Sequence, residues 1–304
     1  MPKDSHTPHS IAIIGAGRIG SAFTYQLAKA GHDLTLIARP GSQRLAQLER
    51  DGGIMLRTGE RADATISDRL DEQQPYDVVI VTVLAHQVDS VLPALERSMA
   101  RCVIFMFATP EAERLRAAIG ADRTQFGFAG VRATLDADGK LNLTIQRVKA
   151  ILEDQRWVNV FRDAGMPARL DPDTGASLRS RAPLTIAMES VTSMGMAEGR
   201  GANWGEARLG ARGVKAGAKI LRAAGDKPAG IDRAPGVVLA VILWGASRAS
   251  FREAVGNSDG EVRGLIDLYV AEARSIGGLD EAIDALEALR PGRAPRQDPV
   301  PRAA

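Results

Sequence analysis

A glycine motif near the N-terminus constrains the fold of this chain more than any other stretch. The apolar run Ile11–Ile14 leads directly into residues 15–20, GAGRIG, which have the spacing G-x-G-x-x-G. An apolar run that ends in such a turn is typical of a buried parallel strand. Ile19, Phe23 and Leu27 then recur along one face of a helix. The motif therefore has the strand before it and the helix after it that a dinucleotide-binding turn requires.

Each of the three glycines has a mechanical role in a turn of this kind. Gly15 permits the tight turn, Gly17 lets the backbone approach a pyrophosphate, and Gly20 lets the helix pack against the strand. The start of the helix then presents free N–H groups and the positive end of its dipole to the phosphates. The alternative is a glycine-rich turn in some other α/β fold. The residues predicted to hold the pyrophosphate are Gly15, Ala16, Gly17, Arg18, Ile19 and Gly20.

The end of the second strand indicates which dinucleotide the chain prefers. Residues 34–37 form this strand, and an NAD-binding protein usually places an Asp or Glu after it for the ribose 2′-hydroxyl. Here Arg39 follows, and Ser42 and Arg44 come shortly after it. Arg39 can stack on adenine and pair with a 2′-phosphate, and Ser42 or Arg44 can add donors. The sequence predicts NADP(H), with a solvated loop arginine as the alternative.

Composition and charge exclude several function classes. The formal net charge of the 304 residues is +2 with both signs mixed, and aromatic residues make up 4%, so a nucleic-acid surface is not expected. The single cysteine, Cys102, excludes an internal disulfide framework, and four histidines in separate places build no metal site. The N-terminal stretch lacks the apolar core of a signal peptide, and the longest apolar run, 237–244, is too short for a membrane span. We expect a cytoplasmic protein.

The first half of the chain alternates strand-like and helical stretches. Residues 77–83, DVVIVTV, and 102–107 are expected to form buried strands. Further strands are expected over 126–128, 131–135 and 141–145, with Asp138-Gly139 as the turn between the last two. We predict helices over residues 87–99 and 158–164.

From about residue 175 strand signals are absent, and helical periodicity or alanine-rich composition replaces them. Helices are predicted over residues 183–197, 206–224, 237–255, 261–276 and 280–289. The fold class is therefore α/β, an N-terminal Rossmann-type dinucleotide-binding domain followed by an all-α C-terminal domain. The expected boundaries are a disordered tail (1–10), the NADP-binding domain (11–174), a helical substrate and dimerisation domain (175–290) and a second disordered tail (291–304). The active site is expected in the cleft between the two domains.

This arrangement resembles the ketopantoate reductase family over nearly the whole chain. Residues 11–20 are similar to the family's cofactor loop, and Arg39 lies where the family has its NADPH-selecting arginine. Residues 79–88, VIVTVLAHQV, are similar to the family's fourth-strand segment, and 126–128 with the following strand pair to the end of its first domain. Two helical stretches also resemble the family, residues 216–225 and 261–277.

The resemblance implies site residues and also shows where this chain departs from the family. Leu84 stands where the family has its cofactor-side lysine, and Val83 directly precedes it. Ala108 stands where the family has an asparagine. The general-acid lysine and the next asparagine of the second domain correspond to Arg181 and Thr185. Glu261 keeps the family's glutamate. The implied catalytic residues are Arg181, Thr185 and Glu261.

The implied function is an NADPH-dependent oxidoreductase that transfers hydride to a carbonyl of a small, 2-oxo acid-like substrate. Arg181 cannot replace a lysine as proton donor because a guanidinium stays protonated, but it can anchor a carboxylate or polarise a carbonyl. The proton would then come from water or from neutral Glu261. The alternatives are an oxidoreductase for imines or amino acids, and a degenerate NADP-binding sensor or assembly protein. A homodimer, if one forms, is expected through the helical domain.

Overall fold

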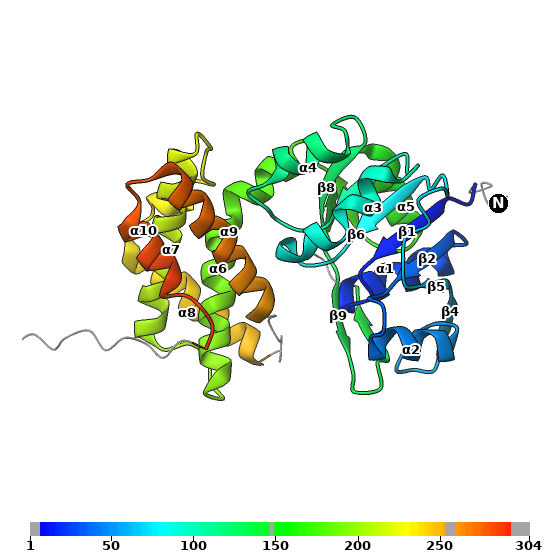
Figure 1. Ribbon diagram of the computed structural model, residues 1–304. Helices are drawn as coiled ribbons and strands as arrows, with labels where there is room; N and C mark the ends of the chain where they lie inside the picture. Colours follow the sequence, from blue (N-terminus) through cyan, green and yellow to red (C-terminus); the bar gives the residue numbers. More distant parts are fainter. Residues whose placement is uncertain (1–6, 146–148, 253–258, 293–304) are drawn as a thin grey trace, which may run out of the picture. The chain divides into compact units, whose positions relative to one another are not determined.

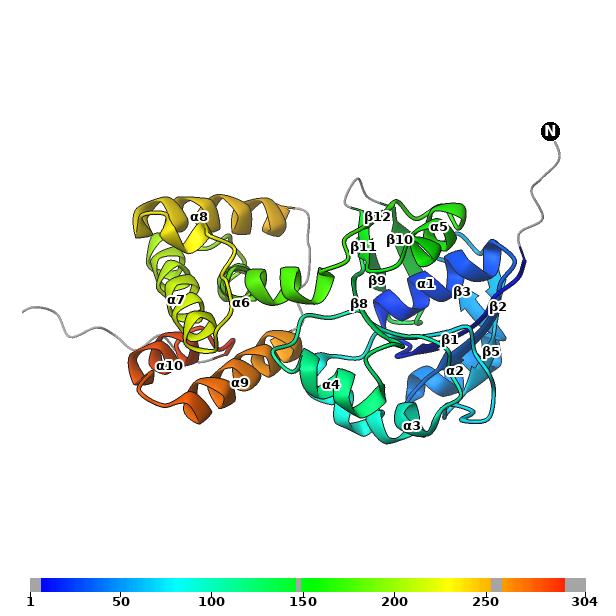
Figure 2. The ribbon, with the colours of Figure 1, turned by 90° about the horizontal axis from the view of Figure 1, so that it is seen from above.

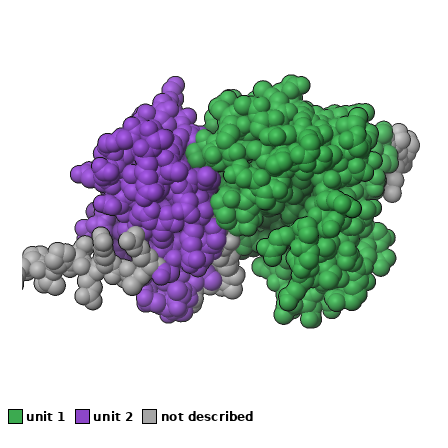
Figure 3. Space-filling view, viewed as in Figure 1, with its two compact units in different colours: residues 1–178 green, residues 179–304 purple. Residues whose placement is uncertain are grey.

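The computed structural model describes residues 7–145, 149–252 and 259–292. The chain divides into unit 1, residues 1–178, and unit 2, residues 179–304, which are green and purple in Figure 3. Within the two tails expected from the sequence, residues 1–6 and 293–304 lie outside the described part of the chain.

Unit 1 is built on one twisted sheet with the strand order β12-β11-β8-β7-β6-β1-β2-β5. All neighbouring strands run parallel except β11 and β8, which are antiparallel. The strands are β1 (Ser10–Ile14), β2 (Asp33–Ile37), β5 (Thr65–Ser67), β6 (Val78–Val81), β7 (Val103–Phe105), β8 (Thr124–Phe128), β11 (Ala150–Leu152) and β12 (Ala168–Leu170). Two hairpins stand outside this sheet, β3 (Gly53–Met55) with β4 (Arg61–Asp63), and β9 (Arg132–Leu135) with β10 (Leu141–Thr144).

Helices cover both faces of this sheet (Figures 1 and 2). Ile11 and Ile13 point into a core shared with α1 (Arg18–Lys29), α2 (Gln43–Asp51) and α5 (Gln155–Asp163). Ala12 and Ile14 point into the opposite core, which is shared with η1 (Ala85–Ser90), α3 (Leu92–Arg97) and α4 (Ala112–Ile119). A strand that is apolar on both faces, as β1 is, belongs in the middle of such a doubly wound sheet. The predicted Rossmann-type fold is confirmed.

The strand order reverses next to β1. From β1 the chain proceeds through β2 to β5 on one side, and then returns to β6 on the other side. The loops that follow β1 and β6 therefore leave the sheet in opposite directions and open a crevice at its C-terminal edge. The glycine motif follows β1 and so lies at this point.

Unit 2 is helical in its described part. Its elements are α6 (Thr174–Ala197), which begins in unit 1, α7 (Trp204–Ala223), η2 (Ile231–Arg233), α8 (Gly236–Arg252), α9 (Asp259–Ile276) and α10 (Asp280–Glu287). The central helix α7 packs against α8, α9 and α10. Small residues permit this close packing: a Cβ on Gly213 would lie 2.2 Å from Leu289 Cδ1, and one on Gly210 would lie 2.8 Å from Leu243 Cδ1.

The structure corrects three sequence predictions. The helix expected to begin at Pro183 begins at Thr174 instead, with the proline inside it. The helix expected over 87–99 is a 3₁₀ segment followed by the short helix α3, which has Pro93 in its first turn. Strands β11 and β12 were not predicted, because a run of three residues carries too little periodicity to be recognised.

Candidate functional site

The glycine turn is held in place by hydrogen bonds to β2 and to the residue that follows β6. Gly15 has a φ of 111°, and its N–H donates to the Ile37 carbonyl at 3.0 Å. The Thr82 hydroxyl, just beyond β6, lies 3.1 Å from the Ile14 carbonyl and 2.9 Å from the Gly15 carbonyl. Thr82 was not singled out from the sequence, although a threonine inside the apolar run DVVIVTV is a polar group that needs a partner. Its contacts fix the path of the turn between β1 and α1.

The three glycines have different surroundings. A Cβ on Gly20 would lie 1.8 Å from the Gly15 carbonyl oxygen, and a Cβ on Gly15 would lie 2.8 Å from Thr82 Oγ1. These two positions need glycine for the fold itself. A Cβ on Gly17 would meet no atom within 4 Å, and Gly17 has no left-handed φ, so the protein itself does not require a glycine there. Open space above an exposed glycine is what a closely approaching ligand needs.

Helix α1 begins without a side-chain cap. Gly17 is its N-cap residue and has no side chain to accept a hydrogen bond, and its first turn contains no acidic residue. The start of α1 therefore presents the positive end of the helix dipole without a side-chain cap or an acidic side chain, which favours an anion there. Ala16 is buried, whereas Arg18 and Ile19 are half-buried at this end of the helix.

The end of β2 carries the arginine that the sequence pointed to. The Arg39 side chain is exposed and has no hydrogen bond or ion pair with other residues in the described ranges, while its carbonyl accepts the Ser42 N–H at 3.1 Å. Ser42 caps α2, because its hydroxyl oxygen accepts the Leu45 N–H at 3.2 Å. No carboxylate lies between Ile37 and Arg44, and Asp33 stands at the opposite end of the strand. The local charge at this strand end is therefore positive.

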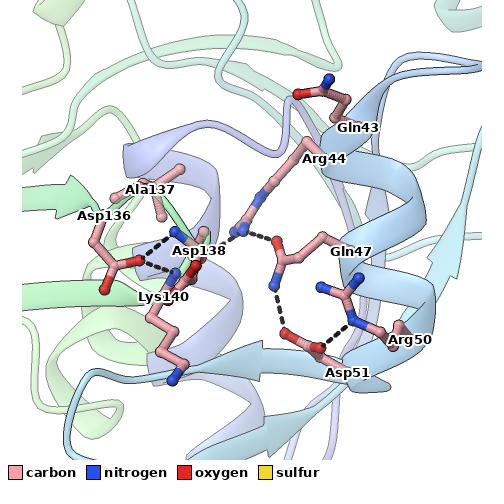
Figure 4. A pocket seen from close by; sticks show the side chains of 11 residues that line it. Gln43, Arg44, Gln47, Arg50, Asp51, Asp136, Ala137, Asp138 and Lys140 are labelled. Carbon is pink, nitrogen blue, oxygen red and sulfur yellow. Dashed lines mark hydrogen bonds and ion pairs between the residues drawn. The ribbon is translucent and has the colours of Figure 1, made fainter.

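The Arg44 side chain, in contrast, is hydrogen-bonded to other groups of the protein. Its Nε donates to the Ala16 carbonyl at 3.0 Å, and its Nη2 donates to the Ser21 hydroxyl at 2.7 Å. Its Nη1 donates to the Gly139 carbonyl at 2.6 Å and to the Gln47 side chain. Burial lowers the pKa of this guanidinium from its ordinary value. Arg44 lines a groove of about 570 Å³ between α2 and the β9–β10 hairpin (Figure 4).

The remaining cofactor-side residues follow neighbouring strands. Val83 and Leu84 are half-buried just after β6, and Ala108 is half-buried shortly after β7. Strands β7, β6, β1 and β2 are adjacent in the sheet and parallel. The residues predicted to hold a dinucleotide therefore share one edge, over about 14 Å at the usual strand spacing.

Arg181 and Thr185 lie together on α6 in unit 2. Both side chains are exposed, one helical turn apart, and the Thr185 hydroxyl lies 3.5 Å from the Arg181 carbonyl. Glu261 lies in the first turn of α9, and its side chain is outside the described residues.

The spacing of these three residues follows from the packing of α6 against α9. Arg179 donates to Glu272 at 2.6 Å, and Ser193 donates to Asp259, so the two helices run antiparallel. This register places Glu261 level with about residue 191 of α6. At 1.5 Å per residue, the axial offset from Glu261 is about 9 Å for Thr185 and about 15 Å for Arg181. Thr185 thus lies between the other two along the helix axis.

Arg179 is a structural residue, although it resembles Arg181 in the sequence LRSR. Its guanidinium also donates to Asp226 at 2.6 Å, and its side chain is 12% exposed. Of these two arginines, only Arg181 is exposed to solvent. Among the residues of known placement, no cluster of His, Cys, Asp or Glu could hold a metal ion, and no helix is long and apolar enough to cross a membrane.

Comparison with known proteins shows which family most of unit 1 resembles. Residues 11–152 match the family model described as ketopantoate reductase PanE/ApbA. Residues 11–152 are therefore similar to the ketopantoate reductase PanE/ApbA domain. A curated relative, the 2-dehydropantoate 2-reductase of Bacillus subtilis (strain 168), is 32% identical over 96 residues, which is 32% of each chain. The match spans about a third of the length of that relative, so the family resemblance inferred from the sequence is confirmed on this part.

Solved structures extend the similarity of fold to nearly the whole chain. A PanE/ApbA family ketopantoate reductase from Ralstonia eutropha JMP134 superimposes with a TM-score of 0.70 at 20% identity, covering 92% of this chain and 97% of the other. D-mandelate dehydrogenase in complex with NADH gives a TM-score of 0.68 at 16% identity, with coverages of 92% and 97%. At these identities the similarity establishes the ketopantoate reductase fold and no more.

Proposed function

We propose that this chain is a nicotinamide dinucleotide-dependent oxidoreductase that acts on a small 2-oxo or 2-hydroxy acid, with NADP(H) preferred over NAD(H). The observation that carries the proposal is the open space above Gly17. Gly15 and Gly20 are required by contacts inside the protein, whereas Gly17 is not. A ligand at the uncapped start of α1 accounts for it, and a pyrophosphate fits both the space and the dipole.

The preference for NADP(H) is supported by the charge at the end of β2. Arg39 is exposed there and has no acidic neighbour in the segment that follows. A carboxylate at this place would accept from a ribose hydroxyl and repel a phosphate, whereas a guanidinium can form charge-assisted hydrogen bonds to the phosphate. The bound dinucleotide would supply or accept the hydride. The complex of D-mandelate dehydrogenase with NADH shows that the other cofactor occurs on this fold.

Arg181 is proposed as the residue that binds the acid group of the substrate. It is exposed, and its fork of donors matches a carboxylate. Thr185, one turn further along α6, would hold the substrate by its hydroxyl, and Glu261 would orient the substrate or deliver the proton. Arg181 lies about 15 Å along the helix axis from the level of Glu261. The two residues would therefore bind different groups of the substrate, Arg181 the acid group and Glu261 the group that reacts.

The names of the similar proteins point to one substrate class. The curated relative is a 2-dehydropantoate reductase, and D-mandelate dehydrogenase also binds anilino(oxo)acetate in a solved structure. These compounds share a 2-oxo or 2-hydroxy acid group, which presents a carboxylate or its derivative beside the reacting carbon. This shared group is what Arg181 would recognise.

The proposal is tested by following NADPH absorbance with a panel of 2-oxo acids, each with and without ammonium. We expect substrate-dependent oxidation without ammonium, and a KM at least tenfold higher in Arg181→Met with a smaller change in kcat, since a charge-assisted pair is lost. Arg208→Met, an arginine of α7, is the control. Turnover only with ammonium would favour an imine or amino-acid oxidoreductase. Tight NADPH binding without any turnover would favour a sensor or assembly protein.

A further inference from the structure

We infer that Arg44 is a positioning residue for the dinucleotide, which holds the glycine turn in its binding shape by joining it to α2 and to the tip of the β9–β10 hairpin. This inference rests on the proposed function. It gives Arg44 a role different from that of Arg39, although both follow β2 and both carry a guanidinium. It also gives a function to the hairpin, which stands outside the main sheet.

The donors of Arg44 are almost fully used by the protein. A guanidinium has five N–H groups in a rigid fork. Four of them are directed to Ala16, Ser21, Gln47 and Gly139, one N–H to each. No pair of adjacent donors remains for a bidentate contact with a phosphate. Arg44 therefore acts on the turn and not on the cofactor's 2′-phosphate.

The contact with the turn is made at its buried side. Ala16 and Ser21 are both buried, and the Ser21 hydroxyl lies 3.3 Å from the Ala16 carbonyl that Arg44 also binds. Ala16 stands between Gly15 and Gly17, so fixing its carbonyl fixes the peptide planes on either side. Thr82 restrains the Gly15 carbonyl, whereas the Ala16 carbonyl, between two flexible glycines, is held by Arg44 and Ser21. Arg44 thus restrains the turn on its buried side.

The hairpin is shaped to receive Arg44. Gly139 has a φ of 76°, and a Cβ there would lie 2.7 Å from Arg44 Nη1 and 2.4 Å from Gln47 Oε1. The Asp136 carboxylate accepts the N–H groups of Asp138 and Lys140 at 3.1 and 2.8 Å, which closes the hairpin tip. Figure 4 shows these groups facing one another across the groove. The Gly139 carbonyl is thereby presented to the guanidinium at a fixed place.

Cofactor titrations on Arg44→Met test the inference. The pyrophosphate is common to NADPH and NADH, so we expect both affinities to fall by the same factor, about tenfold, with their ratio unchanged. Arg44→Lys is expected to behave like Arg44→Met, because one ammonium cannot reach Ala16, Ser21 and Gly139 together. Arg50→Met is the matched control, because Arg50 lies on the same helix and in the same groove. Its ion-pair partner at 3.4 Å is Asp51 and not the glycine turn, so neither affinity should change.

Gly139→Ala tests the same link from the hairpin side. Its Cβ displaces Arg44 without altering any residue near the phosphates, and the loss should equal that of Arg44→Met. The double variant should bind no more weakly than either single variant. Three results would overturn the inference: a loss of affinity for NADPH alone, unchanged dinucleotide affinity in Arg44→Lys, or additive losses of affinity in the double variant.

Hydrogen exchange of the protein without cofactor separates this inference from the proposed function. In Arg44→Met the amides of residues 16–21 and of Gly139 should exchange at least tenfold faster than in wild type, while those of the central strand β6 stay protected. Unchanged exchange at the turn would refute the positioning role, whether or not a dinucleotide binds. Failure of wild type to bind either dinucleotide would refute the proposed function and leave the exchange result to decide the role of Arg44.

Discussion

Pro183 sits inside α6 because a side chain from another helix replaces the missing hydrogen bond. A proline has no N–H, so the Arg179 carbonyl one turn earlier loses its helical donor. The Tyr269 hydroxyl of α9 donates to this carbonyl at 3.2 Å. Tyr269 is fully buried, and burial raises the pKa of its hydroxyl, so it remains a donor at all ordinary pH values. The sequence could not show this, because residue 269 is far from Pro183 along the chain.

We predict that Tyr269→Phe lowers the free energy of unfolding by about 1–3 kcal/mol, because it leaves a buried carbonyl without a donor. Urea denaturation measures this cost. In a Pro183→Ala background the new N–H supplies the donor, and the same change should cost clearly less. An equal cost in both backgrounds would contradict this explanation of how the proline is accommodated.

At the scale of single residues, the sequence carries a signal only where the role of a residue is local. The glycine spacing and Arg39 at a strand end are features of neighbouring residues, and the structure finds Gly15 and Gly20 against Thr82 and one another. The contacts of Arg44 join residues 16, 44 and 139, and no spacing rule connects these. The assignment of Arg181, Thr185 and Glu261 came from family resemblance and stays a prediction.

At the scale of elements, the start of α6 depends on a buried carboxylate. Glu153 accepts the Gly175 N–H at 2.9 Å and the Phe126 N–H at 3.0 Å, and so joins the first turn of α6 to β8. The Arg116 guanidinium lies 3.9 Å away, and 4.9 Å from the centre of the Phe126 ring. Burial raises the pKa of Glu153 above its ordinary value of 4.5 in spite of these partners. Because Glu153 is 22 residues from Gly175, the sequence placed the helix start at the nearer signal, Pro183.

We predict that Glu153 makes the stability of the chain fall as pH rises from 4.5. Above that value the unfolded chain releases the proton, whereas the folded protein retains it until the raised pKa is passed, so the folded state binds more protons in this window. The contribution is complete below pH 4.5 and lost above the raised value. Urea midpoints measured across this range should show a smaller decrease for Glu153→Gln than for wild type. Glu113→Gln, an 88% exposed partner of the same Arg116, should follow wild type.

At the scale of the whole molecule, the predicted fold class, an α/β part with a mostly parallel sheet followed by a helical part, is confirmed. The continuous apolar runs of β1 and β6 and the long periodic run of α7 were recognised because the sequence alone indicates which of their residues are buried. The two short strands at the β11 and β12 edge were missed because their burial depends on α5 and β8. The family match and the similar solved structures concern the fold, so hydride transfer and its substrate stay proposals.

The central claim, a dinucleotide site at the glycine turn selected by Arg39, is tested most directly by titrating wild type and Arg39→Ala with NADPH and with NADH. We expect wild type to bind NADPH more tightly, and Arg39→Ala to lose about 1.5–3 kcal/mol of NADPH affinity while NADH affinity changes little. Equal affinities in wild type, or an equal loss for both dinucleotides, would contradict the role of Arg39. Absence of binding by either dinucleotide would contradict the site itself.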